Sequence, residues 1–456
     1  MSELTNPSAA YMDCIHNLCA DYKIYNSLTE EARNNSSIKR GLRNDDGTGV
    51  MVGCTKVGNV LGYHIVDGER EPMEGRLMYR GYDLTDLVNA YVSEKRFGFK
   101  EVAYLLLFGH LPDQKHYQMF DALLEESAAL PDNFTEDMIL KHPSHDVMNK
   151  LGRSVLALYS NDPNPDDLSV ENMMRQSIEL VARFPAIAAY AYVVKKHYFD
   201  NDSLYLHRPM PELSAAENIL RMIRLDKNYT LEEARVLDLC LVCHAEHGGG
   251  NNSTFTCRSV ASTGTDTYSA IAAAVGSLKG PKHGGANRAV LNQFEEVKAN
   301  VRDWKDDEEV AAFVKRILKG EVSDHTGLVY GMGHAVYTLS DPRAVILKSG
   351  AQKLAQEKGM LDELKLMEAI ERVTPAAFQQ ITGKEKVMCA NVDMYSGLIY
   401  RMLDIPPELF TPLFAVARVT GWCAHRMEEV LTGGRIYRPA YKSLIRHKDY
   451  IPMSER

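Results

Sequence analysis

The stretch Gly280-Pro281-Lys282-His283-Gly284-Gly285-Ala286-Asn287 places a histidine just before the start of a predicted helix. Gly280 and Pro281 interrupt the chain, and the spacing of apolar residues from 286 to 297 predicts an amphipathic helix. The first N–H groups of a helix lack internal partners and carry partial positive charge. We therefore expect His283 to remain neutral near pH 7 and still donate a hydrogen bond. Such a donor suits the stabilisation of a developing enolate oxygen.

Helical periodicity extends outward from this stretch over most of the chain. It predicts helices over residues 84–94, 99–107, 117–130, 172–196, 215–223, 231–243, 265–278, 342–357, 361–373, 394–403 and 407–431. The last of these is apolar almost all round, which is typical of a core helix. Strand signals are confined chiefly to residues 57–66 and 77–79. We therefore predict an all-α fold with a short β-hairpin near the N-terminus.

Composition argues against several classes of function. The 456 residues carry a net charge of −9, which disfavours a nucleic-acid partner and requires a locally positive pocket for any anionic substrate. The longest apolar run, residues 184–194, is too short to span a membrane. The N-terminus lacks the features of a secretion signal, and the eight cysteines form no framework. We expect a cytoplasmic protein with reduced thiols.

Two later segments supply groups that could act together with His283. They are Gly331-Met332-Gly333-His334-Ala335-Val336-Tyr337, with Asp341-Pro342-Arg343 after it, and Asn391-Val392-Asp393-Met394-Tyr395-Ser396-Gly397. Together these segments resemble the citrate synthase family. The resemblance extends to residues 77–82, 244–251, 418 and 435–439, and it covers residues 50 to 440 approximately.

The resemblance implies a citrate-synthase-like, multi-helical fold of two domains. A large discontinuous helical domain would comprise residues 46–282 and 396–456, and a smaller inserted domain would comprise residues 283–395. His283 and Asp393 would then lie near the two crossing points, at the mouth of a cleft. Residues 1–45 are polar, and we expect them to form an N-terminal extension made of a surface helix and a tether.

The resemblance also implies a reaction, the condensation of acetyl-CoA with oxaloacetate and the hydrolysis of citryl-CoA to citrate and CoA. This reaction is the entry to the tricarboxylic acid cycle. Asp393 would take a proton from the acetyl group, His283 would donate to the thioester carbonyl, and His334 would polarise the ketone. From the local sequence alone, Asp393 could instead cap the helix that follows it. His334 could likewise be a structural core histidine.

Five further residues are assigned to oxaloacetate by the same resemblance: His247, Asn251, Arg343, Arg418 and Arg438. Arg418 lies among apolar residues, and a buried guanidinium needs a carboxylate from the protein or from a ligand. Arg343 could instead be a solvated surface residue. Arg438 would reach the site of the neighbouring subunit, so the expected assembly is a homodimer.

The resemblance makes weaker assignments for coenzyme A. Lys384 and Lys386 fall on a segment that approaches the CoA phosphates in relatives. Thr338 departs from the family pattern, because many relatives carry a basic residue there that meets CoA. We expect no metal and no resident cofactor, because coenzyme A enters as part of the acyl-CoA substrate.

Other functions fit parts of the sequence. A 2-methylcitrate synthase would use propionyl-CoA with the same residues, and one methylene shifts such a preference by only ~1–3 kcal/mol. A non-catalytic sensor could bind CoA or a carboxylate, although the intact set of His283, His334 and Asp393 argues against it. The sequence Cys240-Leu241-Val242-Cys243-His244 fits a haem-attachment pattern and, with His247, suggests a zinc site. Haem attachment needs export to an oxidising compartment, which the N-terminus does not support. A zinc site of this kind needs a second cysteine pair, and none follows, so we disfavour both the haem and the zinc site.

Overall fold

A computed structural model describes residues 8–26, 38–67, 69–445 and 447–456. The chain forms two compact units, Met1–Val52 with Arg438–Arg456, and Gly53–Tyr437. The surface helix predicted for the N-terminal extension is α1 (Ala9–Asn26), most of whose described side chains are exposed. The predicted tether falls mainly on residues 27–37, outside the described residues. The larger unit holds every predicted site residue except Arg438.

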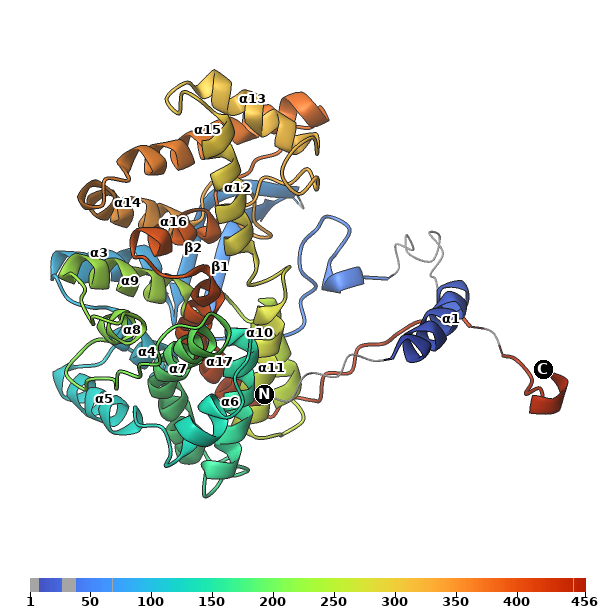
Figure 1. The fold of residues 1–456 in the computed structure, drawn as a ribbon, viewed down its shortest axis with the longest axis horizontal. Helices are drawn as coiled ribbons and strands as arrows, with labels where there is room; N and C mark the ends of the chain where they lie inside the picture. The colour runs from blue at the N-terminus through green and yellow to red at the C-terminus, as the bar shows by residue number, and fades with distance from the viewer. Residues whose placement is uncertain (1–7, 27–37, 68, 446) are drawn as a thin grey trace. The chain divides into compact units, whose positions relative to one another are not determined.

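The larger unit is predominantly helical, as the periodicity predicts (Figure 1). Its helices are α3 (Leu84–Ser93), α4 (Phe99–Phe108), α5 (Gln114–Ser127), α6 (Val147–Leu158), α7 (Val170–Phe199), α8 (Ala215–Ile223), α9 (Leu231–His244), α10 (Asn252–Ala261), α11 (Thr267–Lys279), α12 (Ala286–Asn300), α13 (Asp307–Leu318), α14 (Pro342–Glu357), α15 (Leu361–Thr382), α16 (Val392–Met402) and α17 (Phe410–Leu431). Shorter helical turns in the chain are η1 (Arg40–Leu42), η2 (Thr135–Leu140), η3 (Tyr159–Asn161), η4 (Pro407–Leu409) and η5 (Met453–Glu455). Helices α12 to α15 gather at one end of the unit in Figure 1. A domain division at residues 283 and 395 stays a prediction.

Capping residues explain where several helices begin. At α8, the Ser214 hydroxyl and the Glu217 side chain form a reciprocal capping box, and the helix has the predicted bounds. The helix predicted over 117–130 begins earlier, because the Asp113 side chain caps α5 by accepting from a backbone N–H. The end predicted at residue 373 is wrong, because α15 continues through Pro375.

The core is built around α7 and α17, which pack against each other. Most residues of α17 are buried, as its all-round apolar sequence predicts. By length and composition alone α7 could cross a membrane, but 78% of its most apolar 18-residue window is buried within the protein. Such burial is typical of the central helix of a folded core.

A small antiparallel sheet accompanies the helices. It consists of β1 (Gly58–Val66), β2 (Glu69–Tyr79) and β3 (Tyr82–Asp83) in the order β1-β2-β3. The β1–β2 pairing runs from Gly58 opposite Tyr79 to Val66 opposite Glu69, with a shift in register between them. The predicted hairpin is thereby confirmed, although β2 is longer than the predicted strand.

Two glycines let this hairpin lie directly against residues 336–340. A Cβ atom on Gly62 would lie 2.4 Å from the Val336 carbonyl oxygen, and one on Gly75 would lie 2.1 Å from the Ser340 carbonyl oxygen. Thr338 Oγ1, for its part, accepts a hydrogen bond from the Met73 N–H at 3.2 Å. Because 336–340 connects His334 to Arg343, the hairpin supports the segment that carries two predicted site residues.

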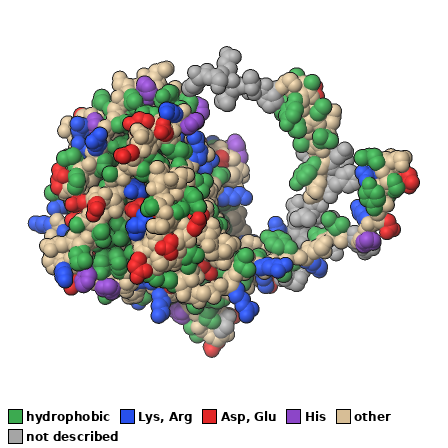
Figure 2. Space-filling model, turned by 90° about the horizontal axis from the view of Figure 1, so that it is seen from below, with side chains coloured by type: hydrophobic (Ala, Val, Ile, Leu, Met, Phe, Trp, Pro, Cys, Tyr) green, Lys and Arg blue, Asp and Glu red, His purple; other side chains and the backbone are tan. Residues whose placement is uncertain are grey.

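On the face of the larger unit that Figure 2 shows, acidic side chains are interspersed with basic ones. The net charge of −9 is therefore not gathered into one acidic region on this face.

Candidate active site

Hydrogen bonds hold the segment of His334 against the segment of Asp393. Gly333 N–H donates to the Cys389 carbonyl at 2.7 Å, and Asn391 N–H donates to the Gly331 carbonyl at 2.8 Å. The Asn391 side chain donates to the Gly333 carbonyl at 2.9 Å. Gly331 and Gly333 have φ angles of 84° and 88°, which favour glycine. Two motifs that are about sixty residues apart in the sequence therefore meet in space.

Asp393 lies in the first turn of α16 and does not cap it. The cap is Asn391, whose Oδ1 accepts from the Asp393 N–H at 3.0 Å, so the capping interpretation of Asp393 is wrong. Its side chain is partly exposed. Burial raises the pKa of Asp393 to about 6, against the opposing charge of Arg343. A carboxylate with this pKa is a stronger base than an ordinary aspartate and is still mainly ionised at pH 7.

The ring of His334 is oriented by the backbone. Its Nδ1 accepts from the N–H groups of Val336 and Tyr337, at 3.0 and 3.1 Å. An Nδ1 that accepts hydrogen bonds carries no proton, so the proton of the neutral ring is on Nε2. The His334 ring stacks on Tyr337 and meets the edge of His247, with centroid distances of 4.6 and 5.1 Å. Its Nε2 is therefore the nitrogen suited to donate to a ligand.

His283 lies three residues before α12, as the sequence predicts, and it contacts α10. Its Nε2 is 3.0 Å from the Ser253 hydroxyl, and that hydroxyl accepts from Trp422 Nε1 at 3.1 Å. Burial and, to a smaller extent, the charge of Arg418 together lower the pKa of His283 to about 4. The predicted neutral state is confirmed, but its cause is burial and a nearby cation rather than the helix terminus alone.

Arg343 is buried and paired with an internal carboxylate. It is 3% exposed, so it is not a solvated surface residue. Its Nε and Nη2 donate to the two oxygens of Asp341 at 3.0 and 2.7 Å. Burial opposes its charge, but Asp341 keeps the pKa of Arg343 above its ordinary value. Asp341 also accepts from the Val392 N–H at 3.2 Å, which ties Arg343 to the start of α16.

Arg418 is fully buried and only partly satisfied. Its Nε donates to the His244 carbonyl at 2.6 Å, whereas Nη1 and Nη2 have no hydrogen-bond partner among the described residues. Burial lowers the pKa of Arg418 to about 10, although the charge of Glu246 raises it. A buried guanidinium with unmet donors is costly, and an anionic ligand would satisfy it.

The remaining predicted residues divide into two groups. His247 is buried near His334 and Arg418, and burial holds its pKa well below the ordinary value. Asn251 is partly buried beside His283, because its Oδ1 lies 2.9 Å from the Ser253 hydroxyl oxygen that also contacts His283. The other group, Lys384, Lys386 and Arg438, is exposed and is not brought to these side chains by any described contact.

Sequence reasoning missed several residues of the site. Ser253 and Trp422 orient His283, and both are buried. His244 is fully buried, stacks on Phe414, and has no hydrogen-bond partner for either ring nitrogen among the described residues. Its position three residues before His247 is the one sequence signal that could have found it. No local pattern singles out a serine on α10.

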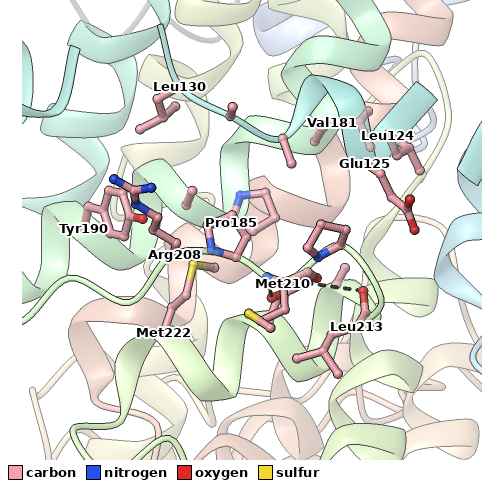
Figure 3. Close-up of a pocket in the computed structure, with 18 of the residues that line it drawn as sticks. Leu124, Glu125, Leu130, Val181, Pro185, Tyr190, Arg208, Met210, Leu213 and Met222 are labelled. Atoms are coloured by element: carbon pink, nitrogen blue, oxygen red, sulfur yellow. Dashed lines mark hydrogen bonds between the residues drawn. The ribbon is translucent and has the colours of Figure 1, made fainter. Parts of the chain in front are cut away.

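The cavity in Figure 3 is separate from this site. It has a volume of about 510 Å³ and lies between α5, α7, α8 and the loop before α8. Leu124, Pro185, Met210 and Met222 point into it, and no predicted site residue lines it. The cavity is therefore not part of the candidate site, because the residues that line it are distinct from those of that site.

The haem and zinc interpretations find no support in the described residues. Cys240 and Cys243 are fully buried in α9, and burial raises the pKa of both thiols. A buried thiol with a raised pKa is a poor nucleophile and a poor metal ligand. Within the described part of the chain, no three His, Cys, Asp or Glu side chains are grouped as a metal site requires.

The chain is similar to several known proteins along most of its length. A family model described as "Citrate synthase, C-terminal domain" matches residues 47–440. A citrate synthase from Synechocystis sp. is 36% identical over 84% of this chain and 89% of its own length. A 2-methylcitrate synthase from Shewanella oneidensis is 31% identical over 83% of this chain and 90% of its own.

Solved structures show the same likeness. Citrate synthase from Pyrobaculum aerophilum matches with a TM-score of 0.74 and 30% identity, over 92% of this chain and 95% of that chain. A ternary complex of citrate synthase from Thermoplasma acidophilum with carboxymethyl coenzyme A and oxaloacetate matches with a TM-score of 0.74 and 26% identity, over 92% and 99% of the two chains. The chain, an acyltransferase by these relatives, therefore belongs to the citrate synthase family.

Proposed function

We propose that this chain condenses acetyl-CoA with oxaloacetate and hydrolyses the citryl-CoA formed to citrate and CoA. The observation that carries the proposal is the pair of unmet Arg418 donors, Nη1 and Nη2. The charge of the same guanidinium favours the ionised form of Asp393, against the effect of burial, and the neutral form of His283. A base, a neutral imidazole and an anion-binding group are thus within electrostatic reach of one another.

In this proposal Asp393 removes a proton from the methyl group of acetyl-CoA. His283 stabilises the resulting enol by donating from Nδ1 to the thioester oxygen. That role requires Ser253 to give its single hydroxyl proton to Nε2 of His283 rather than to Asn251 Oδ1, while the same hydroxyl accepts from the Trp422 N–H. The resulting carbon nucleophile then attacks the ketone of oxaloacetate.

His334 would polarise that ketone through its Nε2 proton and then protonate the new alkoxide. Arg418, Arg343, His247 and Asn251 would hold the carboxylates of oxaloacetate, and Arg438 of a second subunit would complete the set. Lys384 and Lys386 would contact coenzyme A. The proposed reaction needs no resident metal or cofactor. Closure of residues 283–395 over the large domain would exclude water. The same proposal includes a homodimer located in the cytoplasm.

Steady-state kinetics with acetyl-CoA and propionyl-CoA against several 2-oxo acids tests the proposal. We expect a higher kcat/KM for acetyl-CoA than for propionyl-CoA, and a preference for oxaloacetate over the other acids. A preference for propionyl-CoA would make the chain a 2-methylcitrate synthase. No thiol release with any pair would favour a non-catalytic sensor.

A further inference from the structure

The loop between α9 and α10 carries His247 and is held by a buried glutamate. Glu246 is fully buried, and its Oε1 accepts from the Gly248 N–H, one residue beyond His247. Glycine backbone on two other elements leaves room for this side chain. A Cβ atom on Gly421 would lie 2.4 Å from Glu246 Oε2, and one on Gly58 would lie 2.9 Å from its Cγ. The carboxylate is therefore clamped between β1 and α17.

Glu246 also binds a histidine whose protonation is fixed by its partners. His425 Nε2 is 2.8 Å from Glu246 Oε1, and His425 Nδ1 is 2.9 Å from Arg258 Nη1. A guanidinium can only donate, so Nδ1 accepts and the ring proton is on Nε2, directed at Glu246. Burial alone would raise the pKa of Glu246, but the contact with His425 and the charge of Arg418 keep that pKa below its ordinary value.

From Arg258 the hydrogen bonds continue to the C-terminal part of the larger unit. Arg258 Nη2 is 2.9 Å from Glu429 Oε2, and that oxygen accepts from the Tyr437 hydroxyl at 2.8 Å. The Tyr437 ring stacks on Phe255, with a centroid distance of 5.6 Å. The next residue in the chain is Arg438, which we propose to complete the neighbouring subunit's site.

We propose that Glu246 is a positioning residue for oxaloacetate binding, and that its buried hydrogen-bond chain links the His247 loop to Tyr437. Replacing buried charged groups by apolar ones is often neutral or stabilising, so such a chain is a weak device for stability alone. It is suited to holding one geometry, because each member fixes the next. In this way the position of Tyr437, the residue before Arg438, is coupled to the position of the His247 loop. The inference rests on the proposed function.

A double-mutant cycle on the active enzyme tests the link. Glu246→Gln places an amide donor near the Arg418 guanidinium, and we expect the KM for oxaloacetate to rise about tenfold with kcat changed less than about threefold. Tyr437→Phe removes only the hydroxyl and keeps the stacking, and we expect a rise of about threefold to fivefold. If the two belong to one chain, the double variant should resemble Glu246→Gln rather than show the product of the two effects.

Tyr441→Phe is the matched control, because Tyr441 is 94% exposed and lies four residues after Tyr437. It should leave the KM for oxaloacetate unchanged. If Glu246→Gln does not fold, His425→Gln takes its place in the cycle. Multiplying effects in the double variant, or a Tyr437→Phe enzyme that behaves like the control, would overturn this inference alone. A wild-type chain without turnover would overturn the proposed function, and the inference with it.

Discussion

Burial shifts the pKa values of Asp393 and Arg418 in ways that suit the proposed chemistry. Burial raises the pKa of Asp393 to about 6 and lowers that of Arg418 to about 10. Both groups are still charged at neutral pH, one as a base and one as an anion-binding group. Arg418 is held in a state that an anionic ligand would complete, since its Nη1 and Nη2 have no described partner.

The pH dependence of kcat/KM follows from Asp393. A base acts only when ionised, so activity should fall about tenfold per pH unit below its pKa of about 6 and level off above it. His283, with a pKa lowered to about 4, stays neutral over this range and adds no second step. A kcat/KM profile from pH 5 to 8 measures this. A profile that stays flat from pH 8 down to pH 5 would contradict a base with this raised pKa.

Arg418→Met separates binding from folding. Methionine fills a similar volume without a buried charge, so we expect Tm to hold or rise. The KM for oxaloacetate should rise about 100-fold or more, because a charge-assisted bond to a carboxylate is lost. Thermal unfolding and steady-state kinetics on one preparation report both. A strongly lowered Tm with unchanged KM would mean that Arg418 serves an internal partner.

At the scale of elements, the β1–β2 hairpin positions the segment between His334 and Arg343. Gly75→Ala would place a Cβ atom 2.1 Å from the Ser340 carbonyl oxygen and force the two apart. We expect a Tm lower by several degrees and a kcat/KM lower by about tenfold, because both site residues shift. Gly53→Ala is the control, since a Cβ atom there meets nothing within 4 Å. If Gly75→Ala and Gly53→Ala have the same Tm and the same kcat/KM, the hairpin does not position the segment between His334 and Arg343.

The elements also show which features a sequence reveals. Helices with a capping signal and an apolar stripe, such as α8, were predicted with their bounds. Helix α10 was missed because it buries polar side chains, among them Ser253 and Arg258, that serve the site and its surroundings. Helix α13 was also missed, although its buried face (Val310, Phe313, Val314 and Ile317) is regular. In α10 the buried polar side chains hide the helical spacing of apolar residues, whereas in α13 that spacing is regular and could have been recognised.

The whole molecule sets the limit of prediction from local sequence. Asp393 looked like a helix cap until Asn391 was seen to occupy that position, and Arg343 looked like a surface residue until Asp341 was seen beside it. Both partners lie two residues away in the sequence, but local spacing does not encode which side chain takes the cap or that Arg343 is buried. The family resemblance assigned these residues to one candidate site, an assignment that stays a prediction, whereas the residues that support them came only from the structure.

Complementation between subunits tests the proposed dimer. Asp393→Asn and Arg438→Ala should each be nearly inactive alone. In a mixed dimer in which Arg438 acts across the interface, one site receives both native residues, so random re-association should restore about a quarter of wild-type activity. Mixing, unfolding and refolding the two variants together, against each refolded alone, measures this. No recovery would place Arg438 in its own subunit's site or outside any site.

The central claim is that Asp393 is the base of an oxaloacetate-dependent condensation. The most direct test is the release of free CoA thiol from acetyl-CoA, with and without oxaloacetate, by the wild-type chain and by Asp393→Asn. We predict release by the wild type only with oxaloacetate, a loss of about 10²–10⁴ in kcat for the variant, and unchanged oxaloacetate affinity. Near-normal turnover by Asp393→Asn, or release that does not depend on oxaloacetate, would contradict the claim.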